Sequence, residues 1–82
     1  MFLSIFHNKF MKDERNLLLA DNIRAERNRK KITQATLAEM VNVSESTISL
    51  IERGKQTPSV FLVFDISKVL EIDIKDLLKN IK

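Results

Sequence analysis

Apolar residues recur at helical spacing along most of this 82-residue chain, and short polar segments interrupt them. The spacing predicts helices over residues 16–31, 34–41, 45–53 and 58–70, followed by a short final helix that begins after Asp73. No segment alternates apolar and polar residues as a half-buried strand would. The pattern therefore predicts an all-α fold of five helices.

The polar residues between the predicted helices are of the types that begin and end helices. Thr33, Ser44 and Asp73 are good N-caps, because their side chains can accept a hydrogen bond from a free backbone N–H group. Gly54, the only glycine, stands where the end of a helix favours a positive φ. Asn42 tolerates the same left-handed conformation, so we expect a sharp turn between the second and third helices.

The third predicted helix has two different faces. On a helical wheel, Ile48 and Ile51 point together toward the core, whereas Ser46 and Ser49 lie on the opposite face. Small hydroxyl side chains let a helix approach the edges of DNA bases closely, and they can donate or accept hydrogen bonds. Two short helices joined by a tight turn, the second with such a face, form a helix-turn-helix arrangement. The alternative is an ordinary solvated helix face.

Positive charge is concentrated in one part of the chain. The full sequence has 14 Lys and Arg residues against 11 Asp and Glu, a net charge of +3, and residues 24–31 alone carry five positive residues and one negative. Because Lys and Arg bind polyanions by neutralising phosphates, such a cluster favours a nucleic-acid partner. A solvated helix face explains the cluster equally well, so the cluster indicates a nucleic-acid partner only if a second motif supports it.

The inventory of reactive residues argues against catalysis. The chain has no Cys, one Gly and a single histidine, His7, so it lacks a zinc-cysteine site, a Gly-rich phosphate loop and a catalytic His partner. We therefore expect no enzymatic activity, cofactor, metal or small-molecule ligand. The apolar start, residues 1–6, fits neither a signal peptide nor a membrane span, so we expect a cytoplasmic protein without membrane contact.

Residues 32–58 resemble the lambda-repressor-like helix-turn-helix family of phage repressors, Cro proteins and their bacterial relatives; their sequence is ITQATLAEMVNVSESTISLIERGKQTP. The positions that match the family's spacing are Gln34, Leu37, Ala38, Val43, Ser44, Ile48, Ser49, Glu52, Gly54 and Pro58. The resemblance covers roughly residues 19–79. It implies a five-helix DNA-binding domain with the helix-turn-helix at its second and third helices, which reads the major groove with residues 44–53.

The resemblance also implies roles for individual side chains. The residues expected to contact bases are Ser44, Glu45, Ser46, Ser49 and Leu50. The residues expected to contact phosphates are Thr33, Gln34, Thr47, Arg53 and Lys55. The family commonly pairs an Arg of the first helix with a Glu near the end of the third, and Arg27 and Glu52 occupy those places as a structural brace. The alternative for Arg27 is that it merely adds to the basic cluster.

Some positions depart from the family pattern. Asn42 and Lys31 stand where the family often has glycine, so both turns are expected to carry mild strain or to use the left-handed tolerance of Asn. Leu50 is apolar where the family is usually polar or basic, which suits either a thymine methyl group or packing against the sugar edge. Glu45 suits either a cytosine amino group or the rejection of wrong sequences. These side chains do not define one operator sequence.

The fourth predicted helix is apolar nearly all round its first two turns. Val63, Ile66 and Leu70 have the core spacing of the family that the chain resembles, and the other apolar residues stand where that family is more often polar. Such residues would form an exposed apolar patch of the kind that marks an interface. We therefore expect an isologous homodimer. The residues expected in its interface are Phe61, Leu62, Phe64 and Leu78.

Residues 1–15 are expected to form an N-terminal extension, helical or partly disordered, ahead of the domain at residues 16–82. Phe2, Phe6 and Phe10 would share one face if this segment is helical. That face could join the dimer interface, or the segment could fold back over the fourth helix within one chain.

The sequence therefore predicts a sequence-specific, double-stranded DNA-binding transcriptional regulator. We expect a stand-alone repressor that binds a palindromic operator as a dimer. The alternatives are an antitoxin or a restriction-modification controller that uses the same domain, and a protein–protein interaction module.

Overall fold

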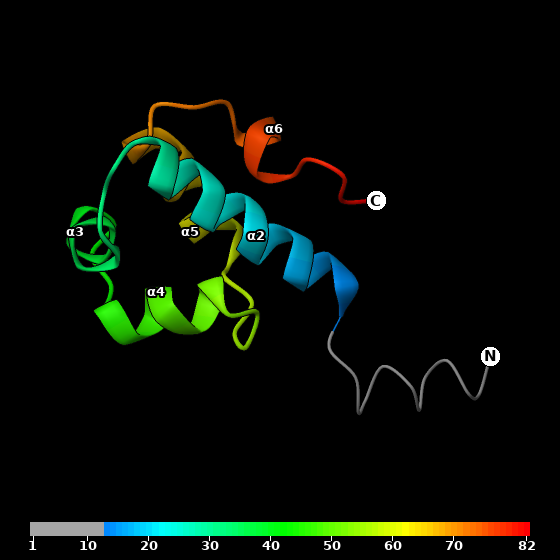
Figure 1. Cartoon of the computed structure of the whole chain (residues 1–82), viewed down its shortest axis with the longest axis horizontal. Helices are drawn as coiled ribbons and strands as arrows, with labels where there is room; N and C mark the ends of the chain where they lie inside the picture. Colours follow the sequence, from blue (N-terminus) through cyan, green and yellow to red (C-terminus); the bar gives the residue numbers. More distant parts are fainter. Residues whose placement is uncertain (1–12) are drawn as a thin grey trace.

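A computed structural model describes residues 13–82, so the expectations for Phe2, Phe6 and Phe10 lie outside the described residues. The helices of the described part are α2 Glu14–Arg29, α3 Gln34–Met40, α4 Glu45–Glu52, α5 Val60–Val69 and α6 Ile74–Leu77. In Figure 1, α2 crosses the front of the molecule, α4 lies below it and α5 lies behind it. Residues 13–82 contain no strand, and the predicted five-helix all-α fold is confirmed.

The predicted N-caps begin their helices as expected. The side chains of Thr33, Ser44 and Asp73 accept hydrogen bonds from backbone N–H groups of α3, α4 and α6, over 3.0, 3.1 and 2.9 Å. Each cap satisfies one of the N–H groups that the first turn of a helix leaves without an intrahelical partner. The starts of these helices can therefore be read from the sequence.

The first predicted helix is shifted by two residues at each end. It begins at Glu14 because Asp13 is its N-cap and accepts a hydrogen bond from the N–H of Arg15 over 2.9 Å. It ends at Arg29 rather than Lys31, because Lys31 has a φ of +59°. Asp13, Glu14 and Arg15, which were expected in the N-terminal extension, thus form the cap and the start of α2.

The fourth predicted helix also begins later than expected. Pro58 lies before the helix and not in its first turn; Ser59 is the N-cap and accepts a hydrogen bond from the N–H of Leu62 over 3.1 Å. The helix ends at Val69 instead of Leu70. The helix begins after Ser59 and not at Pro58, because the Ser59 side chain satisfies a free N–H group of the first turn.

The first four of these helices, α2 to α5, share one way of ending. A residue with positive φ follows each helix: Lys31 at +59°, Asn42 at +62°, Gly54 at +72° and Glu71 at +57°. The next residue then donates its N–H to a carbonyl five positions earlier, as in the Schellman motif. After α2, α3 and α5 this next residue is apolar and packs against the core, but after α4 it is Lys55, which is exposed. Among α2 to α5, only α4, the predicted reading helix, has a charged residue after its left-handed residue.

One hydrophobic core lies between the helices. It contains the predicted inward residues of the third helix, Ile48 and Ile51, and the predicted spacing of Val63, Ile66 and Leu70. The other core residues are Leu19, Ile23, Leu37, Ala38, Val41 and Leu77. Among the helices of residues 13–82, none is long and apolar enough to cross a membrane.

Candidate nucleic-acid interface

The helix-turn-helix consists of α3, the turn at residues 41–44, and α4. The turn is sharp because Asn42 adopts a left-handed conformation and the N–H of Val43 donates to the carbonyl of Ala38 over 2.9 Å. Val43 then packs partly buried against the core, and Ser44 begins α4. These contacts fix the direction in which α4 leaves the turn.

The side chains predicted to contact bases lie on the outer side of α4 and at its start. Ser44, Glu45 and Ser46 are exposed, whereas Ser49 and Leu50 are half-buried. The Ser44 hydroxyl also lies 2.8 Å from the Thr47 hydroxyl, besides capping the helix. Ser44 is therefore engaged within α4, while Glu45 and Ser46 make no side-chain hydrogen bond with another described residue.

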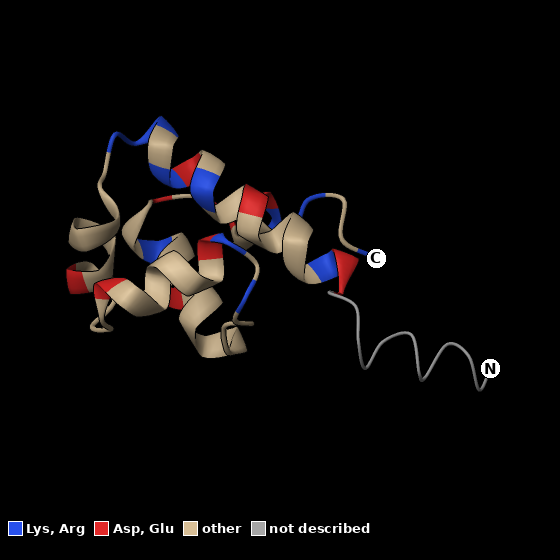
Figure 2. Cartoon of the chain, turned by 60° about the horizontal axis from the view of Figure 1, so that its bottom comes forward, with Lys and Arg blue, Asp and Glu red and all other residues tan. Residues whose placement is uncertain are grey.

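The side chains predicted to contact phosphates lie at two places. Thr33 and Gln34 lie at the start of α3, and Thr47 lies in α4 beside Ser44. Arg53 and Lys55 follow the end of α4 and are exposed. Figure 2 shows Lys and Arg positions in the loop after α4 and at the end of α2. No described contact tests whether these side chains bind phosphate, so their roles stay predictions.

Arg27 and Glu52 form the predicted pair, and it is buried. The guanidinium donates from Nε to Glu52 Oε2 over 2.6 Å and from Nη2 to Oε1 over 2.9 Å. The side chain of Glu52 is 1% exposed and that of Arg27 is 11% exposed. The side-chain hydrogen bond to Glu52 raises the pKa of Arg27, so the guanidinium stays charged.

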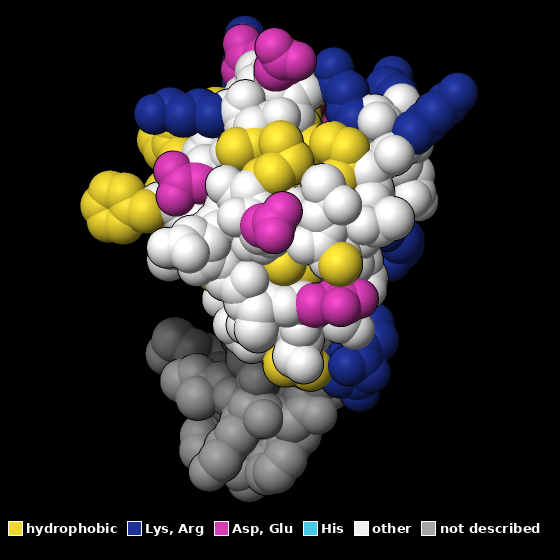
Figure 3. Space-filling view, turned by 90° about the vertical axis from the view of Figure 1, so that its left-hand side faces the viewer, with side chains coloured by type: hydrophobic (Ala, Val, Ile, Leu, Met, Phe, Trp, Pro, Cys, Tyr) yellow, Lys and Arg dark blue, Asp and Glu magenta, His cyan; other side chains and the backbone are white. Residues whose placement is uncertain are grey.

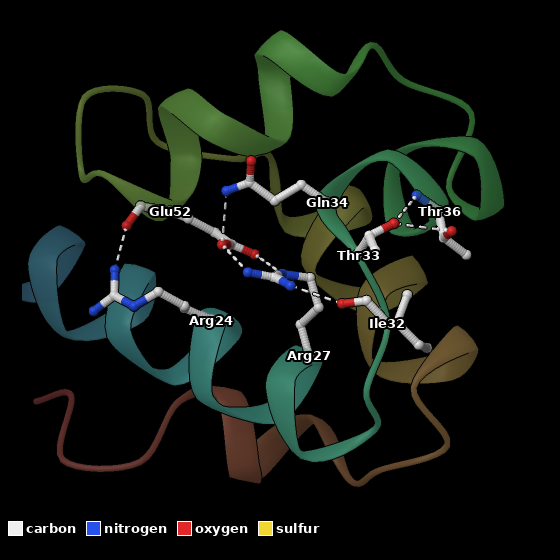
Figure 4. Close-up of polar contacts among 7 residues, drawn as sticks. All are labelled: Arg24, Arg27, Ile32, Thr33, Gln34, Thr36 and Glu52. Atoms are coloured by element: carbon white, nitrogen blue, oxygen red, sulfur yellow. Dashed lines mark hydrogen bonds and ion pairs between the residues drawn. The ribbon is translucent and has the colours of Figure 1, made fainter.

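The buried pair connects three parts of the fold (Figure 4). Arg27 Nη1 donates to the carbonyl of Ile32 over 2.7 Å, in the loop before α3. Gln34 Nε2 donates to Glu52 Oε1 over 3.0 Å, from the first residue of α3. One amide hydrogen of Gln34 is thereby used inside the protein, and its second one remains for another acceptor. Both carboxylate oxygens of Glu52 are satisfied, as a buried charge requires.

Fewer positive side chains of the basic cluster, residues 24–31, are available to bind phosphates than its charge indicates. Its three arginines have acidic partners: Arg24 with Asp21, Arg27 with Glu52, and Arg29 with Glu26. The alternative in which Arg27 merely adds to the cluster is therefore wrong. Lys30 and Lys31 remain exposed at the end of α2, with no acidic partner among the ion pairs of residues 13–82.

Two side chains of α2 that the sequence analysis did not single out as site residues hold the end of α4. Arg24 Nη1 donates to the carbonyl of Glu52 over 2.8 Å, and Asn16 Nδ2 donates to the carbonyl of Gly54 over 3.0 Å. The spacing of residues 16, 20, 24 and 27 places them on one stripe of a helix. It does not show which carbonyls these side chains bind, because the acceptors lie on another helix.

The predicted dimer residues differ in exposure. Phe61 is 76% exposed and Phe64 48% exposed, and Leu78 is also exposed. Leu62 is only partly exposed, because it packs against the core of its own chain. Figure 3 shows apolar side chains on the surface that carries α3, interspersed with acidic ones, and Lys and Arg along one edge.

Comparison with known proteins agrees with this geometry. The model of the helix-turn-helix family HTH_3 matches residues 23–77. An uncharacterised HTH-type transcriptional regulator of Methanocaldococcus jannaschii, MJ0272, is 44% identical over 46 residues, which cover 56% of this chain and 70% of the relative. The chain therefore belongs to the lambda-repressor-like helix-turn-helix family, as the sequence resemblance implied.

Solved structures show the same fold. The P22 c2 repressor, in complex with a synthetic operator, is 39% identical, with a TM-score of 0.68 over 74% of this chain and 92% of the repressor chain. The restriction-modification controller protein C.AhdI of Aeromonas hydrophila has a TM-score of 0.76 over 79% of this chain and 98% of the controller, at 23% identity. The family match, the HTH-type relative and the likeness to the repressor make the chain a DNA-binding transcriptional regulator of this family, and the controller shows the same fold.

Proposed function

We propose that the protein is a repressor that binds double-stranded DNA as a homodimer on a palindromic operator. The observation that carries the proposal is the arrangement of α4, whose polar outer side is exposed while its inner side and its end are fixed. A helix of this kind can enter the major groove without rearranging the domain behind it. A cytoplasmic location, where the DNA is, follows from this function.

In the proposed complex, the exposed side of α4 reads the bases. Ser46 and Ser49 present small hydroxyls to base edges, and Leu50 presents an apolar contact. Ser44 and Glu45 lie at the start of the same helix, which enters the groove first. Thr33, Gln34, Thr47, Arg53 and Lys55 hold the phosphates on either side.

The dimer part of the proposal is supported by the exposed aromatic side chains of α5. Phe61 and Phe64 are large apolar groups in contact with water in the single chain, and burying such groups is the main driving force for association. A two-fold axis through this surface would place two copies of α4 in successive major grooves, about 34 Å apart. The matching operator is an imperfect palindrome.

The salt dependence of binding to a random-sequence duplex tests the phosphate contacts. We expect log affinity to fall steeply with log salt concentration, and Lys55→Ala to make the slope shallower by about 1. Lys68→Ala is the matched control, because it removes an exposed lysine from α5 and should leave the slope unchanged. A flat salt response of the wild type would contradict DNA binding and favour the interaction-module alternative.

Sedimentation equilibrium tests the dimer. We expect the wild type to be dimeric at micromolar concentration and the double variant Phe61→Ser, Phe64→Ser to be monomeric. Leu17→Ser is the control, because Leu17 is also an exposed apolar residue but lies on α2. A monomeric wild type at high micromolar concentration would contradict the dimer.

A further inference from the structure

Side chains on one stripe of α2 form hydrogen bonds with the end of α4. Asn16 and Arg24 donate to the carbonyls of Gly54 and Glu52, and Arg27 pairs with the Glu52 carboxylate. Ala20, which lies between Asn16 and Arg24 on the stripe, is buried, with 2% of its surface exposed. We call Asn16, Arg24 and Arg27 the α2 clamp.

Arg24 has a special place in this clamp. The last carbonyls of a helix have no intrahelical donor and carry the negative end of its dipole, so a cation beside them is stabilising. Arg24 provides that cation at the end of α4, over 2.8 Å to the Glu52 carbonyl. Its Nη2 atom also lies 2.5 Å from Asp21 Oδ1, so its charge is compensated by a carboxylate of α2.

We infer that Arg24 is a positioning residue, which sets the orientation of α4 for base recognition and is not one of the phosphate contacts. The inference rests on the proposed function, because orientation matters only if α4 reads bases. A compensated guanidinium displaces few counterions from DNA, so it adds little to the salt-dependent part of the affinity. A helix end that is held by a charged hydrogen bond loses orientation when that bond is removed.

The distinction is measurable, because phosphate contacts and positioning contacts affect different quantities. The removal of a phosphate contact weakens all sequences alike and makes the salt slope shallower, whereas the loss of orientation reduces the preference for the operator over random DNA. The operator itself can be obtained by selection from random duplexes with the wild-type protein. Operator and random-duplex affinities are then measured across a salt series.

Arg24→Met is expected to leave the salt slope unchanged and to reduce the operator preference by about tenfold. Arg24→Lys should recover part of that preference, because an ammonium group can still donate to the Glu52 carbonyl. Arg15→Met is the matched control: it removes a paired arginine from the same helix, but Arg15 is bonded to Asp13 and not to α4. We expect the control to keep both slope and preference.

A measurement without DNA separates this inference from the proposed function. Amide hydrogen exchange at residues 53–55 should be faster in Arg24→Met than in Arg15→Met, because the end of α4 is released. A slope shallower by about 1 with the preference retained would overturn the inference and make Arg24 a phosphate contact. Unchanged exchange at residues 53–55 would also overturn it, whereas a wild type without any operator preference would contradict the proposed function instead.

Discussion

The two ends of α4 are held in opposite ways. Its end is fixed by other elements: the Glu52 carboxylate is bonded to α2 and α3, and the Glu52 carbonyl is bonded to Arg24. At its start, the side-chain hydrogen bonds come only from its own residues, the Ser44 cap and the hydroxyl contact with Thr47, and the turn before it packs Val43 against the core. The exposed Glu45 and Ser46 follow directly.

The difference shows how one fold can recognise many DNA sequences. Orientation comes from the turn before α4 and from the end of α4, where a buried ion pair and bonded backbone carbonyls permit few substitutions. In the proposed complex, recognition comes from exposed side chains such as Glu45 and Ser46, which can change without disturbing the core. Substitutions at the two ends should therefore have different effects on stability and on DNA preference.

The largest effect on stability is expected when the buried pair is broken. Glu52→Ala should lower the free energy of unfolding by about 3–5 kcal/mol, because it leaves the Arg27 guanidinium buried without its carboxylate. Urea unfolding followed by circular dichroism measures this change. Glu39→Ala, an exposed carboxylate on α3, is the control and should change the free energy by less than about 0.5 kcal/mol.

A smaller loss is expected at the left-handed residue after α4. Gly54→Ala should cost about 1–2 kcal/mol, because alanine is strained at a φ of +72°. A Cβ there would also lie 2.5 Å from Leu17 Cδ2, and that side chain would have to move. Thermal unfolding measures the loss; a variant as stable as the wild type would show that the end of α4 is not constrained in this way.

The start of α4 should be less sensitive. Ser44→Ala removes the cap and is expected to cost about 1 kcal/mol. Ser46→Ala, two residues further on, should change the free energy of unfolding by less than about 0.5 kcal/mol, because the Ser46 side chain is exposed. Equal losses in the two variants, measured by urea unfolding, would contradict the expectation that the Ser44 side chain stabilises α4 and the exposed Ser46 side chain does not.

The smallest effect concerns the start of α2. The side-chain hydrogen bond from Arg15, followed by the bond from its backbone N–H, lowers the pKa of Asp13 below its ordinary 3.8. A lowered pKa in the folded state adds stability above pH 3.8 that is lost as the pH falls through the folded value. The difference in stability between wild type and Asp13→Asn should therefore shrink below about pH 4. A difference that stays constant to pH 2 would contradict this contact.

Most of the fold could be predicted from the sequence, because the local signals are strong. The caps at Thr33, Ser44 and Asp73, and the turn residues Asn42 and Gly54, act through their own side chains or backbones. The left-handed Glu71 could not be found in this way, because no preference of Glu for positive φ marks it. The core packing of Ile72, the apolar residue that follows it, accompanies that turn.

The candidate site was predictable where the resemblance named residues and not where contacts cross between helices. Arg27 and Glu52 were paired correctly, but Gln34 was expected only at a phosphate, and its bond to Glu52 was not foreseen. The role of Arg24 depends on a carbonyl 28 residues away, which no local pattern reveals. The charge count treated Arg24 as an unpaired cation, because a count of charges does not show which groups form ion pairs.

Selection of bound sequences from random duplex DNA tests the central claim most directly. For the wild type, we predict one enriched motif with two inverted half-sites whose centres are about one helical turn apart. For Ser46→Ala with Ser49→Ala, we predict the same half-site spacing but weaker base preference within each half-site. A wild-type pool without an enriched motif, or an identical motif from the double variant, would contradict the claim that the outer side of α4 reads the DNA.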